Sequence, residues 1–239
     1  MKLKLMSDFH DYYDHWFDRK GKTYIRMSKN NISRTEMFDI LFKNKLNVAP
    51  YNKVKNINLR DKYTENIVVY LDEYSHRGKD KELLALDIAK EKYPNKLASK
   101  YLSGFTNKCV DNIKSLSVRL LQIGDYRFWL VYYSTNDWKS NCGDCYINIL
   151  EYDLYNYTDI NYPMYAIDFV IHNEKLYAID FNTSPGLKFT GVEEILTGKE
   201  IYNKIKDYYK YYNENIKSIV LPKQEERKII RKVIDIYHG

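Results

Sequence analysis

The strongest structural signal in the sequence is Tyr165-Ala-Ile-Asp-Phe-Val-Ile-His-Asn-Glu-Lys-Leu-Tyr-Ala-Ile-Asp-Phe-Asn-Thr-Ser-Pro-Gly186. Two short apolar runs flank a polar turn, a pattern that predicts a β-hairpin. Because side chains alternate along a strand, each run is expected to present one set of residues to a common face. The first set is Ala166, Asp168 and Val170, and the second is Leu176, Ala178, Asp180 and Asn182. A three-residue loop at 173–175 would place Asp168 directly opposite Asp180, with Cβ atoms about 5 Å apart.

Two carboxylates that face each other from apolar strands repel, and both lose hydration. A divalent cation between Asp168 and Asp180 would remove that conflict, and ligands that are all oxygen suit Mg²⁺. The alternative is that the two aspartates are solvated on the open face of the hairpin. The hairpin alone therefore indicates either a metal site or an exposed acidic pair.

The composition indicates a globular protein. The chain has 239 residues, 44% hydrophobic and 29% charged, enough for one large domain or for two small lobes around a shared cleft. The formal net charge is +6, but Lys and Arg are spread along the chain without a long block of like charges. We therefore expect a solvated surface, or attraction to phosphorylated small molecules, more than nucleic-acid binding, which stays open.

The cysteines and the N-terminus bear on the compartment. Cys142 and Cys145 form a lone C-x-x-C, and Cys109 lies far from them in the sequence. A structural zinc site needs four ligands, so incidental thiols are expected, with a redox pair as the alternative. Asp8 and His10 interrupt the N-terminus, so neither a signal peptide nor a membrane-spanning run is expected. These features favour a cytoplasmic protein without a membrane contact.

The first half of the chain has mixed helix and strand signals. Ser33 and Glu36 form a capping box, which predicts a helix that ends near Lys45. Strands are predicted over 2–6 and 67–71, and a second helix over 82–92. The residues expected to be buried by the first helix are Met37, Phe38, Leu41 and Phe42.

The second half begins with strands and ends with helices. Strands over 116–123 and 127–133 are joined by a turn at Gly124-Asp125, and another strand is predicted over 146–150. Helical spacing links Ile201, Ile205, Tyr208, Tyr212, Ile216 and Ile219, and then Ile230, Val233, Ile234 and Tyr237. This order of elements predicts an α+β fold with a cleft between two lobes.

The pattern between about residues 95 and 190 resembles the ATP-grasp superfamily. That superfamily includes D-alanine–D-alanine ligases and ligases that extend proteins or peptides with glutamate or lysine. Four segments carry the resemblance, in the order typical of the family. They are Ser117-Val-Arg119 through Gly124-Asp125, Trp138-Lys-Ser-Asn141-Cys-Gly143, the strand with Asp168, and Asp180-Phe-Asn182-Thr-Ser-Pro-Gly186. Asp180 departs from the glutamate usual in the family, which keeps the charge and shortens the reach.

The resemblance implies an ATP-grasp-like α+β fold, in which two α+β lobes enclose a nucleotide cleft and helices form the C-terminus. It implies a short N-terminal α/β region at 1–50, a small ATP-covering lobe at 51–104, and a lobe at 105–239 with the metal site and the terminal helices. The segment 8–18 either contributes to an acceptor site or forms an aromatic-rich helix. The acceptor residues would be His10, Asp11, Asp14 and His15, and the inward-packing aromatic residues would be Tyr12, Trp16 and Phe17.

The resemblance also implies roles for individual residues. Asp168, Asp180 and Asn182 would bind two Mg²⁺ ions that bridge the phosphates of ATP. Arg119 and Lys139 would be the catalytic cations, with Arg119 stabilising the acyl-phosphate or tetrahedral intermediate. The alternative for Arg119 is a structural cation on the edge of a sheet.

Two further regions are expected to contact ATP. Asn141 would contact phosphate or metal, although an asparagine in a loop is also typical of a turn. Tyr101 and Leu102 would line the adenine pocket. In place of a clear glycine-rich loop, the sequence offers Ser75-His-Arg-Gly-Lys79. Its basic residues, His76, Arg77 and Lys79, either cover the triphosphate or form a basic surface turn.

These features favour an ATP- and Mg²⁺-dependent ligase that joins a carboxylate to an amine through an acyl phosphate, with a small molecule or peptide as acceptor. A kinase on the same scaffold is one alternative. A non-enzymatic protein that binds nucleotides or nucleic acid is the other, because the +6 charge and the 25 tyrosines allow stacking on bases.

Overall fold

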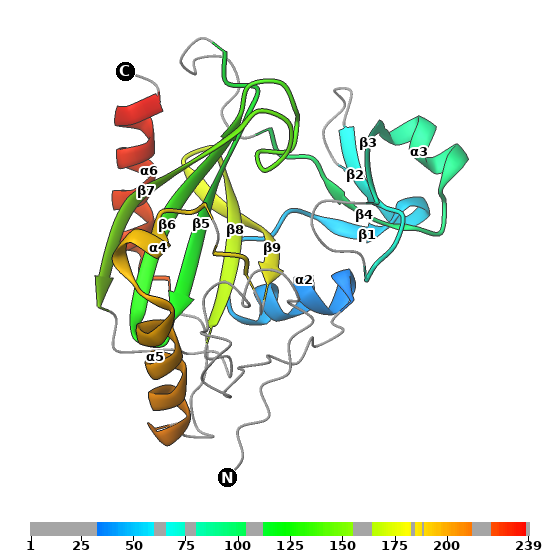
Figure 1. Cartoon of the computed structure of the whole chain (residues 1–239). Coiled ribbons are helices and arrows are strands. Elements are labelled where there is room, and N and C mark those ends of the chain that lie inside the picture. Colours follow the sequence, from blue (N-terminus) through cyan, green and yellow to red (C-terminus); the bar gives the residue numbers. More distant parts are fainter. Residues whose placement is uncertain are drawn as a thin grey trace.

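The computed structural model describes residues 33–59, 66–74, 80–103, 112–154, 164–182, 185–187, 189–211 and 221–237. Figure 1 shows two separate β-sheets with helices packed around them. Every pair of neighbouring strands in these sheets is antiparallel. This is the α+β class predicted from the sequence. No helix in the ranges given is long and apolar enough to cross a membrane.

The smaller sheet has four strands in the order β1-β4-β2-β3. The strand predicted over 67–71 is confirmed as β2. The sequence reasoning missed β1 and β4, which are only three and four residues long. The bounds are β1 (Tyr51–Lys53), β2 (Asn66–Tyr70), β3 (Lys81–Ala85) and β4 (Leu97–Lys100), with a 3-10 turn η2 (Val54–Asn56) and helix α3 (Leu86–Lys92) beside them.

The prediction of a helix over 82–92 is wrong for its first residues. Residues 81–85 form β3, which pairs along its whole length with β2, and α3 starts only at Leu86. Leu83 packs against the main core and Leu84 against a separate apolar cluster, so the two neighbours point to opposite faces, as strand geometry requires. The good helix formers in this run are overridden by pairing with β2.

The larger sheet has five strands in the order β7-β6-β5-β8-β9. All the strands predicted between 116 and 182 are present, although the third is longer than the predicted 146–150. Gly124 has a φ of +56° at the predicted turn between β5 and β6, which glycine adopts without strain. The bounds are β5 (Ser115–Ile123), β6 (Tyr126–Ser134), β7 (Cys145–Leu154), β8 (Met164–His172) and β9 (Lys175–Asn182).

Helices cover the two faces of the larger sheet. Helix α6 (Lys223–Tyr237) buries Ile229, Ile230 and Val233 against one face, as the predicted helical spacing requires, whereas Ile234 is exposed. Helices α4 (Val192–Ile195) and α5 (Gly198–Tyr211) pack against the other face. The remainder of the first predicted C-terminal helix, beyond 211, lies outside the described residues.

Helix α2 (Arg34–Lys43) joins the two sheets. Both hydrogen bonds of the predicted capping box are formed, between Ser33 and Glu36. The apolar side of α2 packs in one core with residues of both sheets (Tyr70 and Leu97 of the smaller one, Leu176 and Phe181 of the larger one). The prediction that Phe42 is buried is wrong, because its side chain is 67% exposed.

The β8–β9 hairpin has the predicted pairing for a different reason. The loop has two residues, Asn173 and Glu174, both with positive φ, instead of the three predicted. Ile179 is an extra residue in β9, a β-bulge, and it restores the pairing of Asp168 with Asp180. The predicted common face of Leu176, Ala178 and Asp180 is therefore wrong, because the bulge reverses the alternation between Ala178 and Asp180.

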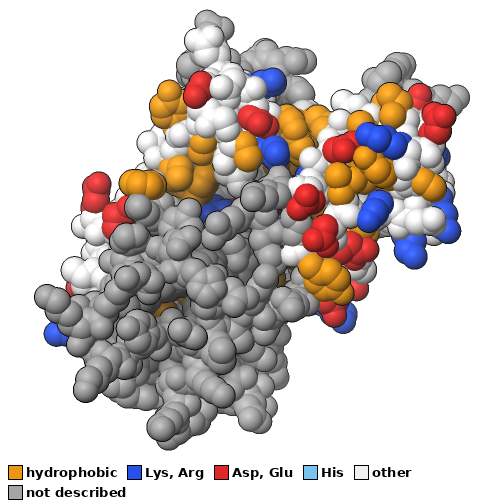
Figure 2. Space-filling model, turned by 45° about the vertical axis from the view of Figure 1, so that its right-hand side comes forward, with side chains coloured by type: hydrophobic (Ala, Val, Ile, Leu, Met, Phe, Trp, Pro, Cys, Tyr) orange, Lys and Arg blue, Asp and Glu red, His pale blue; other side chains and the backbone are white. Residues whose placement is uncertain are grey.

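Some predictions lie outside the described residues. These are the strand over 2–6, the segment 8–18, the loop 75–79 and Cys109. The strands β1–β4 fall within 51–104 and β5–β9 within 105–239, and the domain boundaries stay a prediction. On the face shown in Figure 2, acidic and basic side chains are interspersed over the smaller sheet.

A buried ion pair anchors α6 and gives a test of the fold. Glu225 accepts hydrogen bonds from Arg127 Nη1 at 2.9 Å and from Trp129 Nε1 at 2.8 Å, and Arg127 is only 4% exposed. We expect Glu225→Ala to lower the free energy of unfolding by about 3 kcal/mol, because a buried pair loses its anion. Lys228→Ala removes an exposed ion pair from the same helix and should cost less than about 1 kcal/mol. Urea unfolding measures the free energy of unfolding of both variants. Equal decreases in the two variants would contradict the conclusion that Glu225 anchors α6.

Candidate functional site

A cleft opens on the larger sheet beyond the part that α4 and α5 cover. On that face Leu121 and Ala166 are buried in the cluster with these helices, and further along the same strands Arg119 and Asp168 replace the apolar residues. The space between the walls of the cleft is about 910 Å³, a volume that includes open solvent. Its walls come from both sheets and from the loop between β6 and β7.

Asp168 is bound to Arg119 of the neighbouring strand. The two residues are direct cross-strand partners, and the guanidinium donates from Nε at 2.6 Å and from Nη2 at 2.9 Å to the two carboxylate oxygens. Nη1 donates to the hydroxyl of Tyr132 at 3.0 Å, and the guanidinium also lies over the ring of Tyr132. The pair is therefore held in one orientation at the floor of the cleft.

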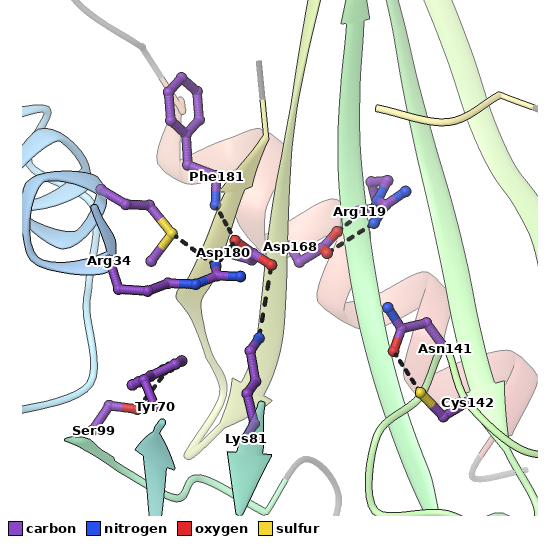
Figure 3. A network of polar contacts seen from close by, with 11 residues as sticks. Arg34, Tyr70, Lys81, Ser99, Arg119, Asn141, Cys142, Asp168, Asp180 and Phe181 are labelled. Carbon is purple, nitrogen blue, oxygen red and sulfur yellow. Dashed lines mark hydrogen bonds and ion pairs between the residues drawn. The ribbon is translucent and has the colours of Figure 1, made fainter. Parts of the chain in front are cut away.

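Asp180 meets two other cations, as Figure 3 shows. Arg34, the first residue of α2, donates from Nη1 to Oδ1, and the backbone N–H of Phe181 donates to the same oxygen at 3.0 Å. Lys81, the first residue of β3, reaches from the smaller sheet to within 3.9 Å of Oδ2. One carboxylate thus connects α2, the smaller sheet and the larger sheet.

Tyr70 supports the two cations from below. Its ring centroid lies 5.7 Å from Cζ of Arg34 and 5.4 Å from Nζ of Lys81, both within the range of cation–π attraction. Its hydroxyl lies 3.1 Å from Oγ of Ser99 on the neighbouring strand. These contacts fix the wall of the cleft that faces Asp180.

Charge and burial oppose each other in this network. Burial raises the pKa of Asp180, but the charges of Arg34 and Lys81 outweigh it and lower the pKa to about 2. Burial lowers the pKa of Lys81, and Asp180 offsets only part of that effect. Burial would also lower the pKa of Arg119, but Asp168 raises it above its ordinary value. The carboxylate of Asp180 is therefore ionised at neutral pH. Of the two cations Lys81 and Arg119, Lys81 is the one whose pKa lies below its ordinary value.

The loop after β6 forms the opposite wall. Lys139 and Asn141 line the cleft, and Nζ of Lys139 lies 5.5 Å from the ring centroid of Trp138. Trp138 in turn meets the ring of Tyr101 edge-on at 6.1 Å between centroids. Cys142 and Cys145 are free thiols in and beside this loop.

Most of the predicted site residues lie together. Seven of them line the cleft: Tyr101, Leu102, Arg119, Lys139, Asn141, Asp168 and Asp180. Asn182 is not among the described residues that line it, although it lies two positions beyond Asp180 on β9. His76, Arg77 and Lys79 lie outside the described residues. The roles assigned to all of these residues stay predictions.

Two residues that contact the acidic pair were missed from the sequence. Lys81 lies two positions after the segment 75–79 that was singled out for its basic residues. It was missed because residues 82–92 were predicted as a helix, so the strand that begins at Lys81 was not recognised. If Lys81-Glu-Leu-Leu-Ala85 had been predicted as a strand, Lys81 would have been considered as a residue of the site. Arg34 lies between the two residues of the capping box, Ser33 and Glu36. The capping box predicts that a helix starts there, but it does not predict that Arg34 pairs with Asp180.

The donor set fits a magnesium ion in part. Mg²⁺ binds through one or two carboxylates together with phosphate oxygens, so the oxygen chemistry of Asp168 and Asp180 is suitable. However, three of the four carboxylate oxygens accept hydrogen bonds from guanidinium groups, and only Oδ2 of Asp180 has no donor closer than 3.9 Å among the described residues. The described residues also contain no group of three His, Cys, Asp or Glu able to hold a metal.

No family model matches the chain, and no curated protein matches it. Among solved structures it is similar to a D-alanine–D-alanine ligase from Bacillus anthracis complexed with ATP, at 11% identity over 74% of this chain and 65% of that one, with a TM-score of 0.46. It is also similar to the macrocyclase MdnC from Microcystis aeruginosa MRC bound with precursor peptide MdnA (11% identity, 73% and 60% covered, TM-score 0.40). A third is an L-amino acid ligase from Bacillus licheniformis (10%, 80% and 52%, TM-score 0.40).

These three structures are ATP-grasp proteins, the superfamily that the sequence resembles. The chain spans 65% or less of the length of each of them. With TM-scores under 0.5, the likeness is too loose to carry a functional inference. An inference about function therefore has to come from the residues of the cleft.

The lowered pKa of Asp180 makes stability depend on pH in the acid range. A carboxyl group with a pKa of about 2 when folded and 3.8 in its ordinary state stabilises the fold above pH 4 and loses that contribution as pH falls towards 2. We expect the free energy of unfolding of the native chain to exceed that of Asp180→Asn by an amount that shrinks by about 2 kcal/mol between pH 4 and pH 2. Asp235→Asn, at an exposed position of α6, is the control and should follow the native chain. A pH-independent difference would contradict the ion pairing.

Proposed function

We propose that this chain is an ATP- and Mg²⁺-dependent ligase that joins a carboxylate to an amine through an acyl phosphate. The observation that supports this best is the convergence of Lys81, Arg119 and Lys139 around Asp168 and Asp180 in one cleft between the sheets. Phosphoryl transfer needs positioning and neutralisation of charge more than it needs a protein nucleophile. A cleft with basic side chains and a pair of carboxylates supplies both.

The balance of charge in the cleft favours a polyanion. Among the described residues that line it, four are basic and two are acidic, a formal excess of two positive charges. The basic residues come from both sheets and from the β6–β7 loop: Lys81, Lys100, Arg119 and Lys139. Low-dielectric walls concentrate such an excess. A triphosphate would satisfy it where a neutral ligand would not.

The apolar part of the cleft suits a nucleotide base. Leu102 and Val170 belong to one small apolar cluster, against which Ile179 packs, and all three line the cleft. The rings of Tyr101 and Trp138 complete this region. Sites with mostly apolar walls and a few placed polar groups are typical for cofactors that have one apolar and one charged end.

Arg119 is placed to stabilise negative charge that develops in the reaction. Its contacts use three of the five N–H groups of a guanidinium, and the other two have no partner among the described residues. Asp168 holds the group in position, and the side chain remains 12% exposed to the cleft. In the proposed reaction, Arg119 donates to the oxygens of the transferred phosphoryl group and then to the tetrahedral intermediate.

Lys81 and Lys139 would bind the phosphate chain from the two walls. Lys81 holds Asp180 only at 3.9 Å, so exchanging it for a phosphate oxygen costs little. Magnesium would be held at Asp180, with Asn182, two positions further along β9, as the proposed second ligand, and when bound it would neutralise charge on the phosphates. The substrate carboxylate attacks the γ-phosphorus and releases ADP, after which the amine attacks the acyl carbon and releases phosphate.

Nucleotide binding is tested first, by thermal shift. ATP with Mg²⁺ should raise the melting temperature, and ATP alone should raise it less. At a concentration 100 times Kd the stabilisation is about 2.7 kcal/mol. Lys81→Met should weaken ATP at least tenfold, because it removes a cation from the phosphate wall. Lys92→Met is the matched control, since Lys92 pairs with Glu82 at an exposed position and does not line the cleft. Absence of any ATP effect would rule out the proposed function.

The reaction is tested by release of ADP in a screen of acceptors. A ligase should release ADP only when both a carboxylate and an amine are present, whether these belong to small molecules or to peptides. Arg119→Met should reduce turnover far more than it reduces the ATP-dependent thermal shift, because Arg119 also stabilises the charge that develops in the reaction. Transfer of phosphate to a hydroxyl acceptor without any amine would instead identify a kinase.

A further inference from the structure

Arg34 lies in the cleft network but comes from neither sheet. It is the first residue of α2, its backbone N–H donates to the carbonyl of Glu73 at 2.9 Å, and its side chain is 6% exposed. Besides its hydrogen bond to Asp180, its Nη1 lies 3.3 Å from Sδ of Met37 in the same helix. The guanidinium is therefore fixed beside Asp180 by the fold itself.

The carboxylate oxygens of the acidic pair differ in what they still offer. Oδ1 of Asp180 accepts from Arg34 and from the backbone of Phe181, which uses both of its lone pairs. Within the part of the chain that the structure describes, Oδ2 of Asp180 has only the ammonium of Lys81 nearby, at 3.9 Å. Both oxygens of Asp168 accept from Arg119. Asp180 thus has one oxygen that is closed to a metal ion and one that is open to it.

We propose that Arg34 is a built-in cation that takes the place of one of the two expected magnesium ions, so that the site holds a single metal ion per nucleotide, through Oδ2 of Asp180. This inference rests on the proposed function, because the metal is the one that accompanies ATP. It differs from the expectation drawn from the sequence, in which Asp168, Asp180 and Asn182 together bind two Mg²⁺ ions.

The three cations of the network differ in how easily a ligand could displace them from their carboxylates. Moving Arg34 off Oδ1 would break the buried ion pair between its guanidinium and Asp180, which is strongly unfavourable. Arg119 is held in the same way by both oxygens of Asp168. Lys81 is the exception, because its ion pair is long and its four-carbon stem can turn towards a phosphate. Metal can therefore replace Lys81 at Asp180, and it cannot replace Arg34.

The number of bound metal ions tests the inference directly. Mn²⁺, which can be counted by electron paramagnetic resonance, is titrated into the full chain saturated with the non-hydrolysable ATP analogue adenylyl imidodiphosphate. We expect one bound Mn²⁺ per nucleotide in the native chain and in Arg227→Met, an arginine at an exposed position of α6. We expect two in Arg34→Met, where Oδ1 of Asp180 becomes available. Two ions in the native chain would overturn the inference.

A second measurement needs no nucleotide and guards against poor folding of the variant. Arg34→Met should melt several degrees lower than the native chain, and millimolar Mn²⁺ alone should recover part of that loss. Arg34→Lys, which keeps a cation beside Asp180, should not respond to Mn²⁺, and neither should the double variant Arg34→Met, Asp180→Asn. Equal Mn²⁺ responses in Arg34→Met and in the double variant would assign Arg34 a structural role only and overturn the inference.

The outcomes also separate this inference from the proposed function. If the native chain binds the nucleotide with two ions, the ligase proposal stands and the role of Arg34 falls. If it binds neither nucleotide nor metal, both fall.

Discussion

A single extra residue in β9, Ile179, determines which side of the larger sheet Asp180 occupies. The two-residue turn at Asn173 and Glu174 sets the register of the hairpin from its closed end, and in an uninterrupted ladder Ile179 would face Asp168. Asp180 would then point into the core beneath α2 and α6, where Phe181 now packs. An unpaired carboxylate there would cost several kcal/mol. Because of the bulge, Asp180 meets Arg34 and Lys81 in the cleft instead.

The sites of the three ion pairs show how the chain keeps charges in a partly buried cleft. Each carboxylate has its own guanidinium, Asp168 with Arg119 and Asp180 with Arg34. The lysine that completes the network is the loosest member. Preorganised charges of this kind need little rearrangement when negative charge develops nearby.

Structure could be predicted from the sequence where local sequence rules and tertiary packing favour the same element. The capping box at Ser33, the turn at Gly124 and the alternation in β5 and β8 are each specified by a few neighbouring residues, so the larger sheet and most of the cleft were predictable. The facing of Asp168 and Asp180 was predicted with the wrong loop length, because a longer loop and a bulge give the same pairing. Lys81 was missed because the helix propensity of residues 82–85 conflicts with their pairing to β2. Arg34 was missed because no local pattern reports a contact with a residue 146 positions away.

Helix α2 has a consequence for how the protein loses its structure. Its apolar side lies in one continuous core with Tyr70 of the smaller sheet and Phe181 of the larger one, and the stacking of Phe38 on Tyr51 extends that core towards β1. Neither sheet can come apart without exposing the face of the helix that the other sheet also covers. The two sheets are thereby coupled into one cooperative unit, so probes placed on either of them should report the same transition. The two sheets are separate in architecture, but they do not unfold separately.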